Sequence, residues 1–169
     1  MDIVDFQDRL TAIVRNYPPD IESNWIHDLY KPLKRSPDAI PSGDLLKDLF
    51  EYLDSSKIDA MGFWFLEKCI GDERYICFGA NDTNRIAIDK LNGEVVLRDE
   101  DNELLYLLAD NLSDYLSVFI AFSEYSIKGY YGYKFTGTDR VTLCEACKGI
   151  VRDKRYFLFY EESFSDTIS

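Results

Sequence analysis

The chain has 169 residues, and its 31 acidic and 19 basic side chains give a formal net charge of −12. This length suits a single domain that buries a core without disulfide bonds. The content of 12 Tyr, 11 Phe and 2 Trp excludes a disordered tail or a low-complexity segment. No apolar stretch of about 18 residues predicts a membrane span, and the N-terminus carries carboxylates where a secretion signal carries cations. We therefore expect a cytoplasmic protein with reduced cysteines and no membrane partner.

The negative charge is concentrated in the first three-quarters of the chain. Residues 1–127 carry 25 acidic and 12 basic side chains, whereas residues 128–155 carry 7 basic and 3 acidic ones. An acidic surface repels phosphate backbones, which disfavours direct nucleic-acid binding, and it draws in a basic protein partner by electrostatic steering. The alternative is that the charge only keeps the protein soluble.

Helices are predicted in the first third of the chain. Apolar residues at helical spacing cover one face of residues 1–16, and Pro18 ends that helix because proline lacks an amide hydrogen. The same spacing predicts a short helix over 25–33 and another over 45–53. Ser42 is the expected N-cap of the last of these helices.

Strands are predicted next, over 60–69, 75–78, 85–91 and 95–97. The first of these is short and rich in aromatic residues, and residues 75–78 are a short apolar run. The last two strands follow the period-2 pattern of strands with one buried face. Residues 79–84 favour a turn. Asn92-Gly93 predicts a two-residue type I′ hairpin, because both central positions of that turn need a positive φ. We therefore expect a meander.

Predicted elements continue with a charged turn over 99–103, a short edge strand over 104–108, a helix capped by Asn111, and a helix over 139–155. Residues 129–137 favour a loop or an irregular strand, and residues 156–160 either continue the last helix or form a strand. Strands followed by helices, without βαβ alternation, indicate an α+β protein. We predict a single domain with a mainly antiparallel twisted sheet of about five or six strands flanked by helices.

No motif in the sequence specifies catalysis, a metal site or a cofactor. Cys144 and Cys147 form a CxxC pair, but a second pair of ligands is absent and both lie on the apolar side of the predicted helix, which favours a core role. The lone histidine, His27, has no partner motif for nucleophilic catalysis. Carboxylates over 99–103 begin like a calcium loop but lack its glycine at position six. We expect no enzyme activity, no metal and no cofactor.

The segment 40–122 resembles the SUKH superfamily, which groups bacterial immunity proteins with relatives of the yeast cell-wall assembly regulator. Members share an Ile-Pro or Leu-Pro pair before a helix, matched here by Ile40-Pro41, and a degenerate strand motif with a closing helix. The motif positions in this chain are Ile76, Gly79, Ile86, Asp89, Gly93 and Val95, followed by residues 110–116. Residues 80–83 depart from the glycine- and aspartate-rich run of many relatives.

This resemblance implies a non-enzymatic binding protein. Many bacterial members look like antidotes that bind and block a polymorphic toxin, such as a nuclease or a deaminase; the alternative is a regulatory or scaffold protein without a toxin partner. The whole of 1–169 is then one SUKH-like domain, in which 1–38 and 130–169 are expected to be helical elaborations. A structural role for Asp89, Asn92 and Gly93 in shaping the hairpin is favoured over a functional one.

The partner-binding surface is predicted around the charged turn. Its candidate residues are Trp64, Asp99, Glu100, Asp101, Glu103 and Tyr106. In this hypothesis the carboxylates face a toxin domain with a basic surface and an exposed aromatic residue supplies binding energy. The alternative for each acidic residue is a solvated turn that binds nothing.

Overall fold

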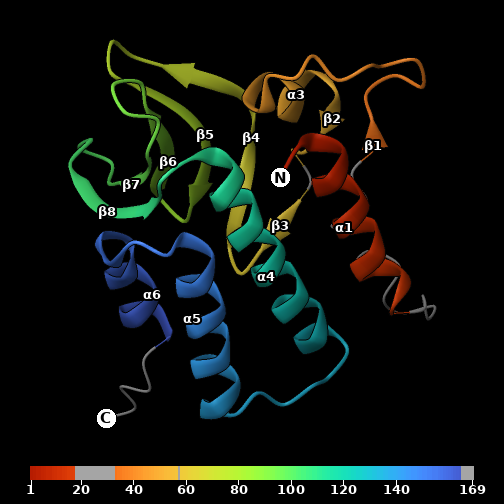
Figure 1. Ribbon diagram of the computed structural model, residues 1–169, viewed down its shortest axis with the longest axis vertical. Helices are drawn as coiled ribbons and strands as arrows, with labels where there is room; N and C mark the ends of the chain where they lie inside the picture. Colours follow the sequence, from red (N-terminus) through yellow and green to blue (C-terminus); the bar gives the residue numbers. More distant parts are fainter. Residues whose placement is uncertain (18–32, 57, 165–169) are drawn as a thin grey trace.

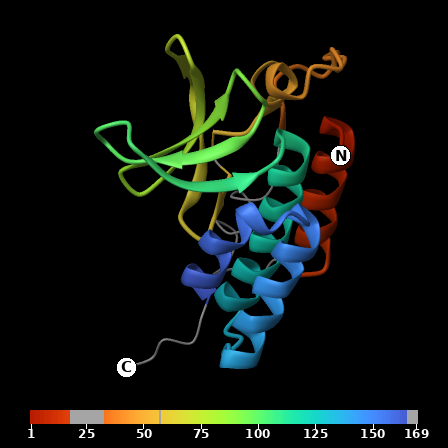
Figure 2. The same ribbon diagram turned by 60° about the vertical axis from the view of Figure 1, so that its left-hand side comes forward.

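The computed structural model describes residues 1–17, 33–56 and 58–164 (Figure 1). Its main feature is a six-stranded antiparallel sheet with the long helices on one side, so the predicted α+β class is confirmed (Figure 2). The helix predicted over 25–33 lies outside the described residues, except that Leu33 begins a short strand.

Neighbouring strands of the sheet follow the chain order. They are β3 (Asp59–Ala60), β4 (Phe63–Gly71), β5 (Tyr75–Asn81), β6 (Asn84–Asp89), β7 (Val95–Arg98) and β8 (Leu104–Ala109). The strand predicted over 60–69 is divided, because Met61 and Gly62 both have positive φ and form a tight turn. The turn predicted over 79–84 is shorter than expected, since β5 and β6 pair as far as Asn81 and Asn84.

The predicted type I′ turn at Asn92-Gly93 is wrong. Gly93 has a φ of 82°, but Asn92 does not have the positive φ that such a turn needs, and the loop spans residues 90–94. The amide of Gly93 donates to the carbonyl of Asp89 at 2.8 Å. The side chains of Asp89 and Asn92 accept from the amides two residues further on, Leu91 and Glu94, and these bonds fix a wider loop.

Strand β7 is buried on both of its faces, although its alternation predicted one buried face. The side chains of Val95 and Leu97 enter the main core, whereas Val96 and Arg98 are buried on the other side of the sheet. The pairing of β4 with β5 and of β5 with β6 is interrupted by bulges, which bend the strands.

The helices are α1 (Ile3–Arg15), α3 (Leu45–Glu51), α4 (Leu112–Tyr130), α5 (Gly137–Val151) and α6 (Phe157–Phe164), with a 3₁₀ turn η1 (Lys154–Tyr156) before the last. Asn111 caps α4 as predicted. The N-cap of α3 is Asp44 and not Ser42, because the Asp44 side chain accepts from the amide of Lys47 at 3.1 Å. Residues 156–160 are helical, and α5 ends at Val151, before Arg152 with its φ of 60°.

A second, two-stranded sheet pairs β1 (Leu33–Lys34) with β2 (Leu53–Asp54). Residues 130–164 contribute α5, η1 and α6 to the fold. In the described part of the chain, no helix is long and apolar enough to cross a membrane.

Aromatic rings along α4 join this helix to the sheet and to both ends of the chain. The ring of Phe119 lies 4.8 Å from that of Phe65 on β4 and 6.2 Å from that of Phe6 on α1, measured between centroids. One turn further on, Phe122 lies 5.2 Å from Phe63 and 5.7 Å from Phe164 on α6. These rings are buried, so α4 is the element that holds the layers together.

Replacing Phe119 by alanine should lower the free energy of unfolding by about 3–5 kcal/mol, because the change removes a fully buried ring and leaves a cavity. Urea unfolding followed by circular dichroism measures the loss. The control is Leu158→Ala on α6, which removes a mostly exposed side chain and should cost less than about 0.5 kcal/mol. Similar losses for the two variants would show that the Phe119 ring is not central to the core.

Candidate partner-binding surface

The turn between β7 and β8 is folded on itself by its own first residue. The amide of Asp99 donates to the carbonyl of Glu103 at 3.0 Å, and the amide of Glu103 donates to the carboxylate of Asp99 at 2.8 Å. Asn102 takes a φ of 69°, which asparagine tolerates better than most residues. The carboxylate of Asp99 therefore shapes the turn, although it was predicted to face a partner.

The buried side chain of Arg98 supports this turn through hydrogen bonds to its backbone. Its side chain is only 7% exposed, and its Nε and Nη2 donate to the carbonyl of Asn102 at 3.1 and 2.8 Å. The guanidinium also lies 3.8 Å from the centre of the Tyr75 ring and 3.5 Å from the carboxylate of Asp72. One buried cation thus joins the tip of the β4–β5 hairpin to the β7–β8 turn, and it presets the shape of the turn.

Three carboxylates of the turn point to solvent. Glu100, Asp101 and Glu103 are all exposed, and among the described residues no lysine or arginine lies within ion-pair distance of them. In Figure 2 the turn projects away from the helices. A rigid turn with three uncompensated carboxylates is suited to meet a cationic surface, because its charges need no rearrangement on binding.

A second turn adds to this surface. A hollow of about 370 Å³ is lined by Asp82 and Thr83 of the β5–β6 turn and by Arg85 of β6, together with Glu100 and Asn102. Asp82 and Arg85 were not among the predicted residues. The predicted meander could have indicated them, because alternate turns of a meander lie at the same end of its sheet. The β5–β6 turn is therefore expected beside the β7–β8 turn.

Trp64 and Tyr106, which were predicted to join the acidic turn, lie on opposite faces of the sheet. Strand register places Trp64 on the face of Ala80 and Arg85, and Tyr106 on the opposite face with Leu97. Both side chains are half-buried, where exposed ones were expected.

Tyr106 is engaged by the C-terminal helix. Its ring lies 5.4 Å from that of Phe159, and its hydroxyl donates to Glu162 at 2.5 Å. This hydrogen bond to a carboxylate raises the pKa of Tyr106 above its ordinary value. The side chain of Tyr106 therefore packs β8 against α6.

The cysteine pair of α5 lies in the core, as predicted. Cys144 and Cys147 are buried, and burial raises the pKa of Cys147 to about 12, which keeps it a protonated thiol at neutral pH. The described residues contain no group of three or more His, Cys, Asp or Glu that could hold a metal ion. His27 lies outside the described residues.

Residues of the family-like motif have structural roles. A Cβ on Gly79 would approach the carbonyl oxygen of Trp64 to 2.9 Å, so only glycine lets β5 lie this close to β4. The carboxylate of Asp89 accepts from Nε and Nη2 of Arg74 at 3.0 and 2.8 Å. This charge-assisted pair ties the β4–β5 hairpin to the β6–β7 loop.

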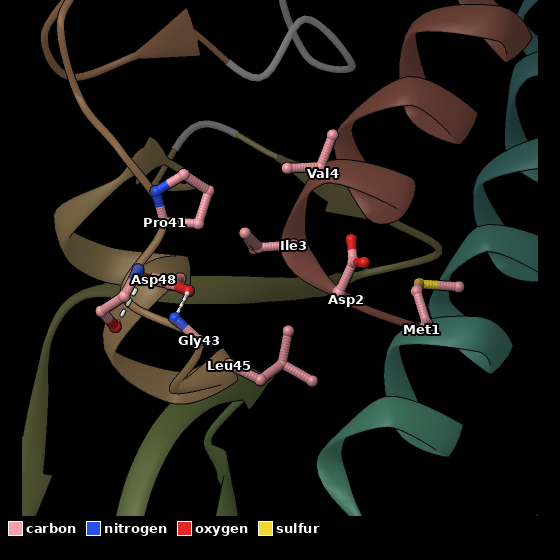
Figure 3. Close-up of a pocket in the computed structure, with 9 residues that line it drawn as sticks. Met1, Asp2, Ile3, Val4, Pro41, Gly43, Leu45 and Asp48 are labelled. Carbon is pink, nitrogen blue, oxygen red and sulfur yellow. Dashed lines mark hydrogen bonds between the residues drawn. The ribbon is translucent and has the colours of Figure 1, made fainter.

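A pocket of about 390 Å³ lies between the start of α1 and the segment before α3 (Figure 3). Pro41 of the Ile-Pro pair lines it, and the buried carboxylate of Asp48 lies at its base. That carboxylate accepts from the amide and hydroxyl of Ser42 and from the amide of Gly43, at 2.7–3.1 Å. Burial raises the pKa of Asp48, but these hydrogen bonds outweigh it and leave the pKa below its ordinary value. Asp48 is therefore engaged in fixing the entry to α3.

In comparison with known proteins, no protein-family model, curated protein or solved structure matches this chain.

Replacing Arg98 by methionine should loosen the acidic turn, because methionine keeps the apolar stem but cannot donate to Asn102. We expect faster amide hydrogen exchange at Asn102 and Glu103 and a loss of about 1.5–3 kcal/mol in unfolding free energy. The control is Arg9→Met, at an exposed site on α1, which should leave both quantities nearly unchanged. Unaltered exchange in the Arg98 variant would show that the turn holds itself.

Replacing Asp48 by asparagine should lower the free energy of unfolding at pH 7 by about 1–3 kcal/mol, because a carboxylate with three donors is lost. The lowered pKa in the folded state means that the carboxylate stabilises the fold above its unfolded pKa of about 3.9 and stops doing so as the pH falls through the folded value. The difference between the two proteins should therefore narrow from about pH 5 to pH 2 in urea titrations. Asp8→Asn, at an exposed site on α1, is the control. A difference in unfolding free energy between the wild type and Asp48→Asn that stays constant with pH would contradict this role of Asp48.

Proposed function

We propose that this chain is a non-enzymatic binding protein that acts as an immunity protein and neutralises a toxin domain by stoichiometric binding. The observation that carries the proposal is the rigid turn over 99–103, whose three exposed carboxylates lack a cation from the described residues. The resemblance of residues 40–122 to the SUKH superfamily supports the same function.

Toxins that act on nucleic acids explain why such a turn is useful. A nuclease or a nucleic-acid deaminase needs a basic surface to hold a phosphate backbone. Glu100, Asp101 and Glu103 present the opposite charge on a preformed scaffold, and the net charge of −12 adds a long-range attraction. An inhibitor of this kind covers the basic surface of the toxin and excludes its substrate.

The test is co-expression with the product of the neighbouring gene. The neighbour should be toxic alone and harmless in the presence of this protein, and the two should form a one-to-one complex. A neighbour that is harmless alone, or that stays toxic when bound, would overturn the antidote function. Binding without any toxicity would favour the regulatory or scaffold alternative.

Charge reversal of the turn, by lysine at Glu100, Asp101 and Glu103, should abolish protection. We expect the association rate to fall about tenfold or more and to become less sensitive to salt, because exposed interface charges act mainly on the rate of encounter.

A matched control reverses three exposed carboxylates elsewhere, at Asp8, Glu67 and Glu124, and so changes the net charge by the same amount. Stopped-flow binding at several salt concentrations compares the two triple variants. Equal effects would show that net charge, and not the turn, steers the partner.

A further inference from the structure

Strand β8 has a strand neighbour on only one side in the described part of the fold (Figure 1). The second half of its free edge is covered by the C-terminal segment. The hydroxyl of Tyr160 on α6 donates to the carbonyl of Leu108 at 2.6 Å, and Leu108 and Ala109 are buried. The first half has no such cover.

The uncovered half of β8 is apolar. Leu104 and Leu105 are 52% and 40% exposed, which is unusual for leucines at a sheet edge. The register steps from Leu97–Tyr106 to Arg98–Leu104, so Leu105 is a bulge residue without a pairing partner on β7. A bulge interrupts the edge and prevents a long strand from adding there, but it leaves room for a short segment.

The charges beside these leucines define what can bind. Glu103 directly precedes Leu104, and Glu100 and Asp101 lie in the same turn, all three without a cation from the described residues. A second copy of the chain does not fit, because pairing of two β8 edges brings two acidic turns and two chains of charge −12 together. A partner with cationic side chains beside an apolar one matches both features.

We infer that the free half of β8, at Leu104 and Leu105, is the anchor site for a short, extended, basic segment of a partner protein that carries an apolar residue between its cations. The cations meet the carboxylates of the 99–103 turn and the apolar residue covers the two leucines. This inference rests on the proposed function, since it names the part of the partner that this surface takes.

The probe is a fluorescein-labelled synthetic peptide of sequence Gly-Lys-Leu-Lys-Val-Lys-Gly, compared with a peptide that has serine in place of leucine and valine. Fluorescence anisotropy should show tighter binding of the first peptide, by about tenfold or more. Leu104→Ser and Leu105→Ser should each weaken its binding about tenfold. Amide hydrogen exchange should slow at residues 104–106 when the peptide is bound.

The control is Leu91→Ser in the β6–β7 loop, which removes a leucine that is 79% exposed and lies outside the candidate surface. An equal loss of binding in this variant, protection of another segment, or equal binding of the serine peptide would overturn the inference. Dimers that form at micromolar concentration and disappear in Leu104→Ser would assign the edge to self-association and would overturn it as well.

Failure of this inference is distinguishable from failure of the proposed function. A protein that protects cells from its neighbour's toxicity, with unchanged protection after Leu104→Ser, overturns the anchor site alone. A protein that binds the peptide at β8 but gives no protection overturns the immunity function alone.

Discussion

The contact between Phe119 on α4 and Phe65 on β4 is the constraint on which the rest of the fold depends. The two rings lie 4.8 Å apart and both are buried, so the helix is fixed against the sheet at the strand where the meander begins. Phe6 packs against both rings and brings α1 to the same side. Because the long helices lie on this side of the sheet, the turn over 99–103 is free to project beyond them (Figure 2).

On the other face of the sheet, the buried Arg98 joins separate elements, as the aromatic rings do in the core. Arg98 contacts Tyr75, Asp72 and the carbonyl of Asn102, and these contacts hold the hairpin tips in place where no helix covers the sheet. The family-like residues serve the same framework, since Gly79 allows a close strand approach and Asp89 binds Arg74. These residues thus build the framework, and the proposed binding is assigned to other residues, in the turn that Arg98 supports.

Sequence periodicity predicted the elements better than it predicted their ends and their faces. The helix capped by Asn111 and the meander follow from local patterns, because apolar spacing and capping act within a few residues. The turn at Asn92-Gly93 was mispredicted because the side chains of Asp89 and Asn92 accept hydrogen bonds from the backbone amides of Leu91 and Glu94. These bonds fix a wider loop in place of a two-residue turn. The acidic turn itself was predicted, but the faces of Trp64 and Tyr106 depend on pairing register and bulges, which only the folded sheet defines.

The distribution of charge in the fold supports the proposal that the turn, and not the whole surface, directs binding. The basic segment 128–155 is partly neutralised within its own chain, since Arg155 pairs with the buried Glu94 at 2.9 Å and Lys148 lies 2.8 Å from Glu161. The first pair fastens η1 to the β6–β7 loop, and the second joins α5 to α6. Glu100, Asp101 and Glu103 form no ion pair with the described residues, so their charges remain open to a cationic partner where β8 begins. Under the proposed function, a basic partner drawn to these carboxylates meets the first half of β8, which the contact of Tyr160 with Leu108 leaves uncovered.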